Sequence, residues 1–143
     1  MSGFTTIKLK DCSAENIEKQ NNVLINCGVP KKYHFYSEND MYDEYIYFTT
    51  HKEQYKNFIK FPEKIKTYNQ FKLVWNTKKL TDFIVPEYGM LTFDCYFNRT
   101  SKRAMHNLAK YLLNNFDAIE SINGSFSTFI EKCGYGDKNQ KKL

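Results

Sequence analysis

The order in which strand patterns and helix patterns follow one another constrains the fold of this chain most strongly. In the segment Phe4–Lys10, one side of an extended chain would carry Thr5, Ile7 and Leu9, and the other Thr6, Lys8 and Lys10. This alternation predicts a half-buried strand. Ser13 then offers a favourable helix N-cap, while Gly28 and Pro30 are residues that end a helix. The N-terminal part of the chain therefore predicts a strand followed by a helix.

The next segments predict further strands around a second helix. Two aromatic and β-branched runs, Tyr33–Tyr36 and Tyr45–Thr49, indicate strands, and the polar, acidic segment Ser37–Glu44 between them indicates a hairpin loop. Thr50 begins a helical pattern, and Phe71–Trp75 predicts the strand after it. The resulting order βαββαβ is the ferredoxin-like arrangement, an antiparallel sheet with helices on one face and the other face open.

A C-terminal strand and helix extend this predicted core. Met90–Phe97 alternates as a strand does, and Ala104–Phe116 carries a long apolar stripe at helical spacing. Ile119–Phe129 is expected to contain another strand, with a hairpin turn at its Asn-Gly pair. We therefore expect a single α+β domain over residues 1–135 and a flexible basic tail over residues 136–143.

The composition limits the classes of function. The chain has 143 residues, a net charge of +5 and 17% aromatic residues, which suit one folded domain rather than a disordered chain. Nineteen of its 21 basic residues are Lys and only two are Arg, the residue type preferred for bidentate recognition of phosphate and guanine. Sequence-specific recognition of duplex DNA is therefore disfavoured. The abundance of Lys, Asn, Tyr, Phe and Ile is typical of an AT-rich genome, such as that of a bacterium, phage or virus.

The cysteine pattern and the N-terminus indicate an intracellular, cytoplasmic protein, in the host cell if the protein is viral. Cys12, Cys27, Cys95 and Cys133 form no CxxC motif and no spacing typical of zinc ligands, so we expect free thiols and neither metal nor cofactor. The first residues lack the apolar region of a signal peptide, and no apolar run is long enough to span a membrane.

An aromatic and basic sheet face is one candidate binding site. If Ile7 and Leu9 face the helices, strand alternation sends Lys8 and Lys10 to the open face. Aromatic rings on a sheet can stack unpaired bases while lysines hold phosphates, so this face would bind single-stranded RNA or DNA. The residues expected on it are Lys8, Lys10, Tyr36, Tyr45, Tyr47 and Lys72.

The segment Tyr45–Phe48 resembles the aromatic end of the RNP1 motif in the RNA recognition motif family. In that family the motif begins with a basic residue and glycine, where this chain has Asp43 and Glu44. The resemblance implies a sheet on which aromatic residues stack two or three bases.

A second candidate site depends on segregated charge. Four carboxylates lie within the predicted acidic loop, and His51–Leu80 carries a local charge of +6. Opposed charges of this kind favour oriented docking on a protein partner. The residues expected to take part are Glu38, Asp40, Asp43, Glu44, Lys56, Lys60, Lys64 and Lys66.

Catalytic motifs do not stand out in the sequence. Cys95 and His106 are the best candidates for a Cys/His enzyme, although nothing in the sequence orients them. The leading hypothesis is therefore a small non-enzymatic protein that occupies a macromolecular partner, such as a phage or viral inhibitor of a host factor. Single-stranded nucleic-acid binding is the first alternative, and a Cys/His enzyme is the second.

Overall fold

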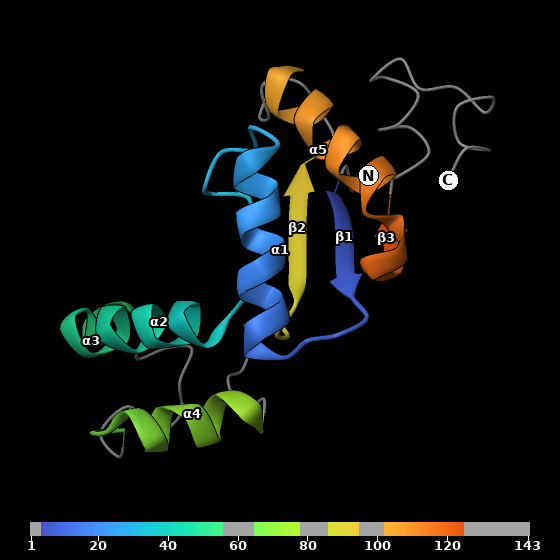
Figure 1. Ribbon diagram of the computed structural model, residues 1–143. Helices are drawn as coiled ribbons and strands as arrows, with labels where there is room; N and C mark the ends of the chain where they lie inside the picture. The colour runs from blue at the N-terminus through green and yellow to red at the C-terminus, as the bar shows by residue number, and fades with distance from the viewer. Residues whose placement is uncertain (1–3, 56–64, 78–85, 95–101, 125–143) are drawn as a thin grey trace. The chain divides into compact units, whose positions relative to one another are not determined.

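The computed structural model shows a mixed α and β protein and describes residues 4–55, 65–77, 86–94 and 102–124 (Figure 1). The three strands pair antiparallel in the order β2-β1-β3. The α+β class is confirmed, whereas this strand order does not confirm the ferredoxin-like topology. In chain order the elements are β1 (Phe4–Leu9), α1 (Ala14–Asn26), α2 (Glu38–Thr50), α3 (Lys52–Tyr55), α4 (Tyr68–Asn76), β2 (Met90–Asp94), α5 (Lys102–Asn114), the 3-10 turn η2 (Phe116–Ala118) and β3 (Ile119–Gly124).

The chain divides into two compact units. Unit 1 combines Met1–Tyr36 with Tyr88–Leu143 and contains the sheet, α1 and α5, and unit 2 is Ser37–Glu87 and contains α2, α3 and α4. The expectation of one domain over residues 1–135 stays a prediction, and the predicted tail lies outside the described residues. Within the described ranges, no helix is both long enough and apolar enough to cross a membrane.

The core of unit 1 forms on one face of β1, as the alternation in the sequence predicts. Ile7 and Leu9 are almost fully buried, while Lys8 between them is only half-buried on the other face. Ile7 pairs with Leu91 of β2 and Ile122 of β3, so apolar side chains continue across the sheet. The helical side of this core is formed by Ile17 and Leu24 of α1 and by Met105, Leu108 and Leu112 of α5 (Figure 1).

Both predicted ends of α1 are confirmed. The Ser13 hydroxyl accepts a hydrogen bond from an amide in the first turn. At the other end, the amide of Val29 donates to the carbonyl of Leu24 (3.0 Å) and the amide of Gly28 donates to that of Ile25 (2.9 Å). This is the Schellman pattern, which needs a left-handed residue, and Gly28 has φ of 85°.

The predicted strand Tyr33–Tyr36 is wrong. This segment is irregular, and the side chain of Asn21 makes hydrogen bonds with its backbone of the kind that a neighbouring strand would make. Asn21 of α1 accepts a hydrogen bond from the amide of Phe35 (2.7 Å) and donates one to its carbonyl (3.2 Å). Both backbone groups of the buried Phe35 are therefore satisfied without a strand ladder.

The predicted acidic loop Ser37–Glu44 and the predicted strand Tyr45–Thr49 are also wrong, because both belong to helix α2. The carboxylate of Asp40 accepts a hydrogen bond from the backbone amide of Ser37 (2.8 Å), which stabilises the start of the helix. Met41 and Phe48, seven residues and two turns apart, are buried on one side. A short aromatic run fits either structure, and here the capping residues favour a helix.

The predicted strand Phe71–Trp75 is wrong for the same reason and lies in α4. The hydroxyl of Thr67 accepts from the amide of Gln70 (3.3 Å), and the side-chain oxygen of Gln70 accepts from the amide of Thr67 (3.2 Å). This capping box begins the helix, and Phe71 and Trp75, one turn apart, are then buried together.

The C-terminal elements agree well with the sequence patterns. The predicted strand at Met90–Phe97 is confirmed over its described part, Met90–Asp94. The predicted apolar stripe is buried in α5 as far as Leu112, whereas Phe116 lies in η2 and is 43% exposed. The predicted strand near the C-terminus is confirmed over Ile119–Gly124. The turn expected at Asn123 and Gly124 is wrong, because both residues pair with β1.

One buried hydrogen bond joins α1 to α5 within unit 1. The hydroxyl of Tyr111 donates to the side-chain oxygen of Gln20 at 2.6 Å, and both side chains are buried. We expect Tyr111→Phe to lower the free energy of unfolding by about 1–3 kcal/mol, because it leaves the buried Gln20 oxygen without this donor. Adding Gln20→Met should recover most of the loss. Urea unfolding followed by circular dichroism measures both, and an unchanged Tyr111→Phe protein would contradict the expectation.

The same tyrosine gives the stability a pH dependence. Burial, and to a smaller extent the nearby Cys27, raises the pKa of Tyr111 above its ordinary value of 10.0. The unfolded chain then loses this proton first, so the free energy of unfolding falls as the pH rises above about 10. We expect a steeper fall in the parent than in Tyr111→Phe, by at most about 1.4 kcal/mol per pH unit. Urea unfolding at about pH 9 and pH 11 measures the difference, and equal slopes would contradict it.

Candidate functional site

Unit 2 is an insertion whose two ends are held side by side in unit 1. The amide of Tyr36 donates to the carbonyl of Met90 (2.8 Å), and the amide of Gly89 donates to the carbonyl of Tyr36 (2.9 Å). The rings of Tyr36 and Tyr88 stack with centroids 6.0 Å apart. Gly89 has φ of 81°, a left-handed conformation that favours glycine. The chain therefore leaves and re-enters unit 1 at one fixed place.

Aromatic side chains pack α2 against α4 inside unit 2. The ring of Phe71 lies 5.6 Å from that of Tyr45, 5.9 Å from that of Phe48 and 5.5 Å from that of Trp75, measured between centroids. The hydroxyl of Tyr45 also donates to the carbonyl of Lys66 (3.1 Å), just before α4. These contacts fix one side of α2 as the core side of the unit.

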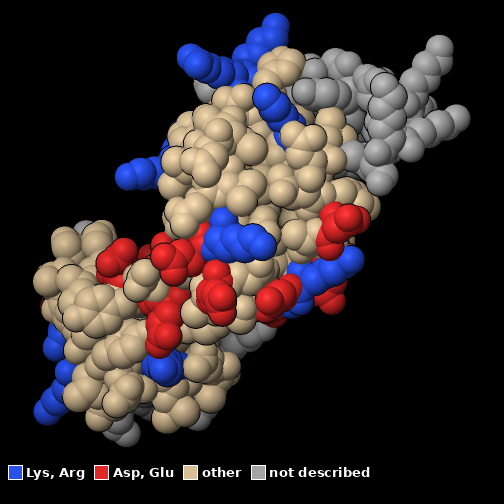
Figure 2. Space-filling model, viewed as in Figure 1, with Lys and Arg blue, Asp and Glu red and all other residues tan. Residues whose placement is uncertain are grey.

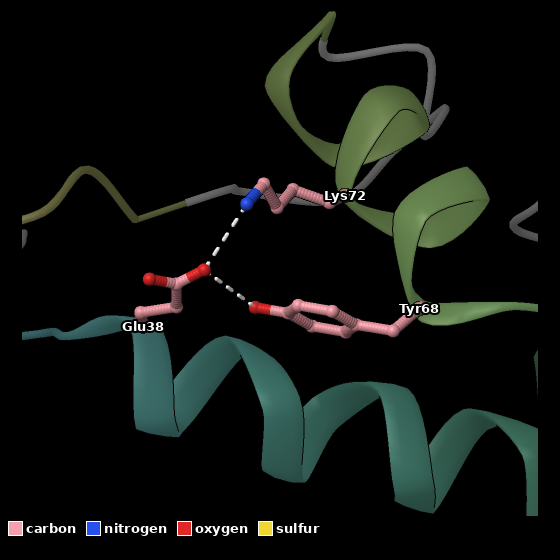
Figure 3. A network of polar contacts seen from close by, with 3 residues as sticks. All are labelled: Glu38, Tyr68 and Lys72. Carbon is pink, nitrogen blue, oxygen red and sulfur yellow. Dashed lines mark hydrogen bonds and ion pairs between the residues drawn. The ribbon is translucent and has the colours of Figure 1, made fainter.

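A polar contact ties the first residue of α2 to α4 (Figure 3). One carboxylate oxygen of Glu38 accepts hydrogen bonds from Lys72 Nζ (3.1 Å) and from the hydroxyl of Tyr68 (3.2 Å). The hydrogen bond from Lys72, its positive charge and the hydrogen bond from Tyr68 all lower the pKa of Glu38. Because Glu38 and Lys72 are both well exposed, the pair positions the helices more than it stabilises them.

The opposite side of α2 exposes large apolar and aromatic side chains. Ile46 and Tyr47 are each 43% exposed there. Tyr42 lies at the edge of this side: it is 48% exposed, and its ring also contacts that of Tyr68 in α4, with centroids 5.2 Å apart. Tyr42 and Ile46 are four residues apart and so are neighbours on the helix surface, as are Asp43 and Tyr47. We call these four residues the outer face of α2.

A hollow adjoins the outer face at the end of the helix. The ring of Tyr47 stacks on that of His51, with centroids 4.1 Å apart and planes 12° apart. His51 in turn lines a hollow of about 470 Å³. The described residues around it are Thr49, Thr50, His51, Lys52 and Glu53.

The charge of α2 is opposite in sign to that of the whole chain. Its sequence holds four carboxylates and neither Lys nor Arg, whereas the chain has a net charge of +5. Figure 2 draws acidic side chains in red, basic side chains in blue and the other described residues in tan on one face of the molecule. One of these acids, Asp43, is exposed on the outer face together with its apolar and aromatic residues.

The open sheet face expected from the sequence is not formed by the predicted residues. Lys8 lies in β1 on the face away from the helices, and Lys10 directly follows that strand. Tyr45 and Tyr47 are in a helix of unit 2, so the strand alternation that placed them beside Lys8 does not apply. Of the other two residues, Tyr36 lies in unit 1, where its backbone is hydrogen-bonded to Gly89 and Met90, and Lys72 lies in α4.

The residues expected to bind a protein divide into several groups. Glu38 and Asp40 make contacts within unit 2, and Asp43 and Glu44 lie further along α2. Lys66 is exposed just before α4. The predicted residues Lys56, Lys60 and Lys64 lie outside the described residues.

Two residues of the outer face, Tyr42 and Ile46, were missed by the sequence analysis. Reading Ser37 and Asp40 as a helix start would have placed both residues on a helix, four residues apart and therefore neighbours on its surface.

The described residues include one of the two predicted catalytic side chains. His106 lies in α5, and its proposed partner Cys95 is outside the described residues, so the Cys/His enzyme stays a prediction. Among the residues that the structure describes, no group of three or more His, Cys, Asp or Glu side chains could hold a metal ion. No protein-family model, curated protein or solved structure matches this chain.

The contact between α2 and α4 gives a prediction for the titration of Glu38. Lys72→Met removes both the hydrogen bond and the positive charge, so we expect the pKa of Glu38 to rise towards its ordinary value of 4.5. Tyr68→Phe should raise it less. The stability that the pair contributes is present above about pH 4.5 and is lost as the pH falls through the folded-state pKa.

NMR titration of the side-chain carboxyl groups measures this effect. Asp11 is the matched control, because hydrogen bonds from Ser13 lower its pKa and it lies in unit 1. Its pKa should be the same in the parent and in Lys72→Met. An unchanged pKa for Glu38 in that variant would show that the contact does not persist in solution.

Proposed function

We propose that this protein is a non-enzymatic binding protein that docks on a basic protein surface through the outer face of α2. The observation that carries the proposal is the two-sided character of this helix. Met41 and Phe48 are buried on one side, at 1% and 0% exposure, while Ile46 and Tyr47 are each 43% exposed on the other. A helix with large apolar residues on both sides is typical of one that is covered on both sides.

The types of residue on the outer face suit protein recognition. Tyrosine is enriched among the residues that dominate binding energy, because it combines a large apolar ring with a polar hydroxyl. Tyr42 and Ile46 are spaced as the anchors of a helix that lies in a groove of its partner. The hollow beside Tyr47 provides room for a side chain of the partner.

The charge of the helix favours a basic partner. Asp43 is exposed among the apolar residues of the outer face, and α2 carries no basic side chain that would repel Lys or Arg. Complementary charge speeds association and fixes orientation more than it adds affinity.

The way in which the two ends of unit 2 are held supports the same role. Tyr36 and Gly89 hold the two ends of the insertion at one place in unit 1. A binding element carried on an insertion can vary in sequence while the supporting core stays folded. Occupying a partner in this way would suit an inhibitor, and a phage or viral inhibitor of a host factor is the class of protein that we propose.

A pair of isoleucine variants tests the proposal. Ile46 on α2 and Ile25 on α1 are exposed to nearly the same extent, 43% and 44%, so Ile46→Glu and Ile25→Glu make the same change on different surfaces. We expect Ile46→Glu to abolish capture of partners from the source cell and Ile25→Glu to leave it intact. Tyr47→Ala should weaken binding by about 2 kcal/mol if Tyr47 is a dominant contact.

The measurement is quantitative mass spectrometry of proteins captured by the parent and by each variant. A supporting result is a specific partner with a basic surface that is lost with Ile46→Glu alone, followed by titration calorimetry with the purified partner. Equal loss with both variants, or retention with both, would contradict docking through the outer face. Circular dichroism of each variant establishes that it is folded.

A further inference from the structure

A second hollow, in unit 1, combines lysine, aromatic rings and an exposed aliphatic side chain. It has a volume of about 240 Å³ and lies between the second half of α1 and the segment that follows Pro30. None of its described lining residues is acidic. These residues are Asn21, Ile25, Lys31, Tyr33 and His34.

Hydrogen bonds between residues close in sequence hold the segment that lines this hollow in one conformation. The amide of Tyr33 donates to the carbonyl of Pro30 (3.0 Å), and His34 Nδ1 lies 2.9 Å from the carbonyl oxygen of Lys31. Asn21 fastens the following residue, Phe35, through both of its backbone groups. The segment that carries the rings is therefore preformed against α1, which lowers the entropy cost of binding.

The hollow brings apolar and aromatic surface together with the ammonium groups of lysine. Tyr33 and His34 provide flat rings, and Ile25 is 44% exposed beside them. Lys31 lines the hollow, and the ammonium group of Lys32 stands 5.0 Å from the centre of the Tyr33 ring. Apolar and aromatic surface edged by ammonium groups suits a ligand that is flat at one end and anionic at the other.

We propose that this hollow binds one nucleotide of a single-stranded nucleic acid. The base lies against Ile25 and the rings of Tyr33 and His34, and the adjacent phosphates contact Lys31 and Lys32. The volume of about 240 Å³ is below the range of about 300–1,000 Å³ that is usual for drug-sized ligands, so the hollow suits a small group such as a single base. Lysine binds phosphate as a point charge, so the site has little sequence preference.

This site is independent of the protein-docking function. It lies in unit 1, whereas the outer face of α2 lies in unit 2. It also differs from the predicted open sheet face, since Lys31, Tyr33 and His34 are on a turn and not on a strand. The pairing of aromatic rings with lysines is the same, but other residues supply it.

Fluorescence anisotropy with labelled single-stranded DNA and RNA tests the phosphate contacts. We expect Lys31→Ala/Lys32→Ala to weaken binding more than the control Lys102→Ala/Lys110→Ala, which removes the same charge from exposed positions of α5. If Lys31 and Lys32 each neutralise one phosphate, the slope of log K against log salt should become less steep by about 1.4 in the first variant only. Equal losses in the two variants would overturn the site.

The base contacts have a separate test. His34→Ala and Ile25→Glu should each lower affinity for the oligonucleotides at least about fivefold, while Ile46→Glu should leave it unchanged. NMR titration with a mononucleotide should shift the signals of Ile25 and His34, and weaker binding than that of the oligonucleotide would identify a strand rather than a free nucleotide as the ligand. No binding of any nucleotide at about 50 mM salt would overturn the proposal.

Discussion

The structure of unit 1 depends on the pairing of β1 with two strands from distant parts of the sequence. Ile7 lies between Leu91 of β2 and Ile122 of β3, so the N-terminal strand is the central one of the described sheet. Only when all three strands are paired is there a continuous apolar face for α1 and α5 to cover. Contacts of such large sequence separation cost loop entropy, which burial of this face must offset.

The same pairing explains how the chain can carry an insertion. β1 and α1 precede unit 2, while β2, α5 and β3 follow it, so the sheet closes around the ends of the inserted segment. The backbone hydrogen bonds of Tyr36 and the left-handed Gly89 fix those ends. Unit 2 then needs only its own aromatic packing, between α2 and α4, to hold its internal shape. One proposed binding site belongs to unit 1 and the other to unit 2.

The local patterns were reliable where one physical cause dominated. Alternation predicted β1 because one face of the strand is buried, and Gly28 marked the end of α1 because the Schellman pattern needs a left-handed residue. The aromatic run Tyr45–Phe48 misled because side chains of this kind suit a strand and a buried helix equally. The capping residues Ser37 and Thr67 distinguish the two structures, because each caps the start of a helix.

The sequence by itself determined the strands β1, β2 and β3 and the helices α1 and α5 of unit 1, the positive charge of the chain and the absence of familiar catalytic motifs. These properties follow from residues that are close in sequence or from simple composition. Only the tertiary structure decided which side of α2 is buried, because the partners of Phe48 lie on α4, beyond a long connection. The exposure of Ile46 follows from that packing. The hollow at Lys31 and His34 likewise forms only because Asn21 folds the segment onto α1.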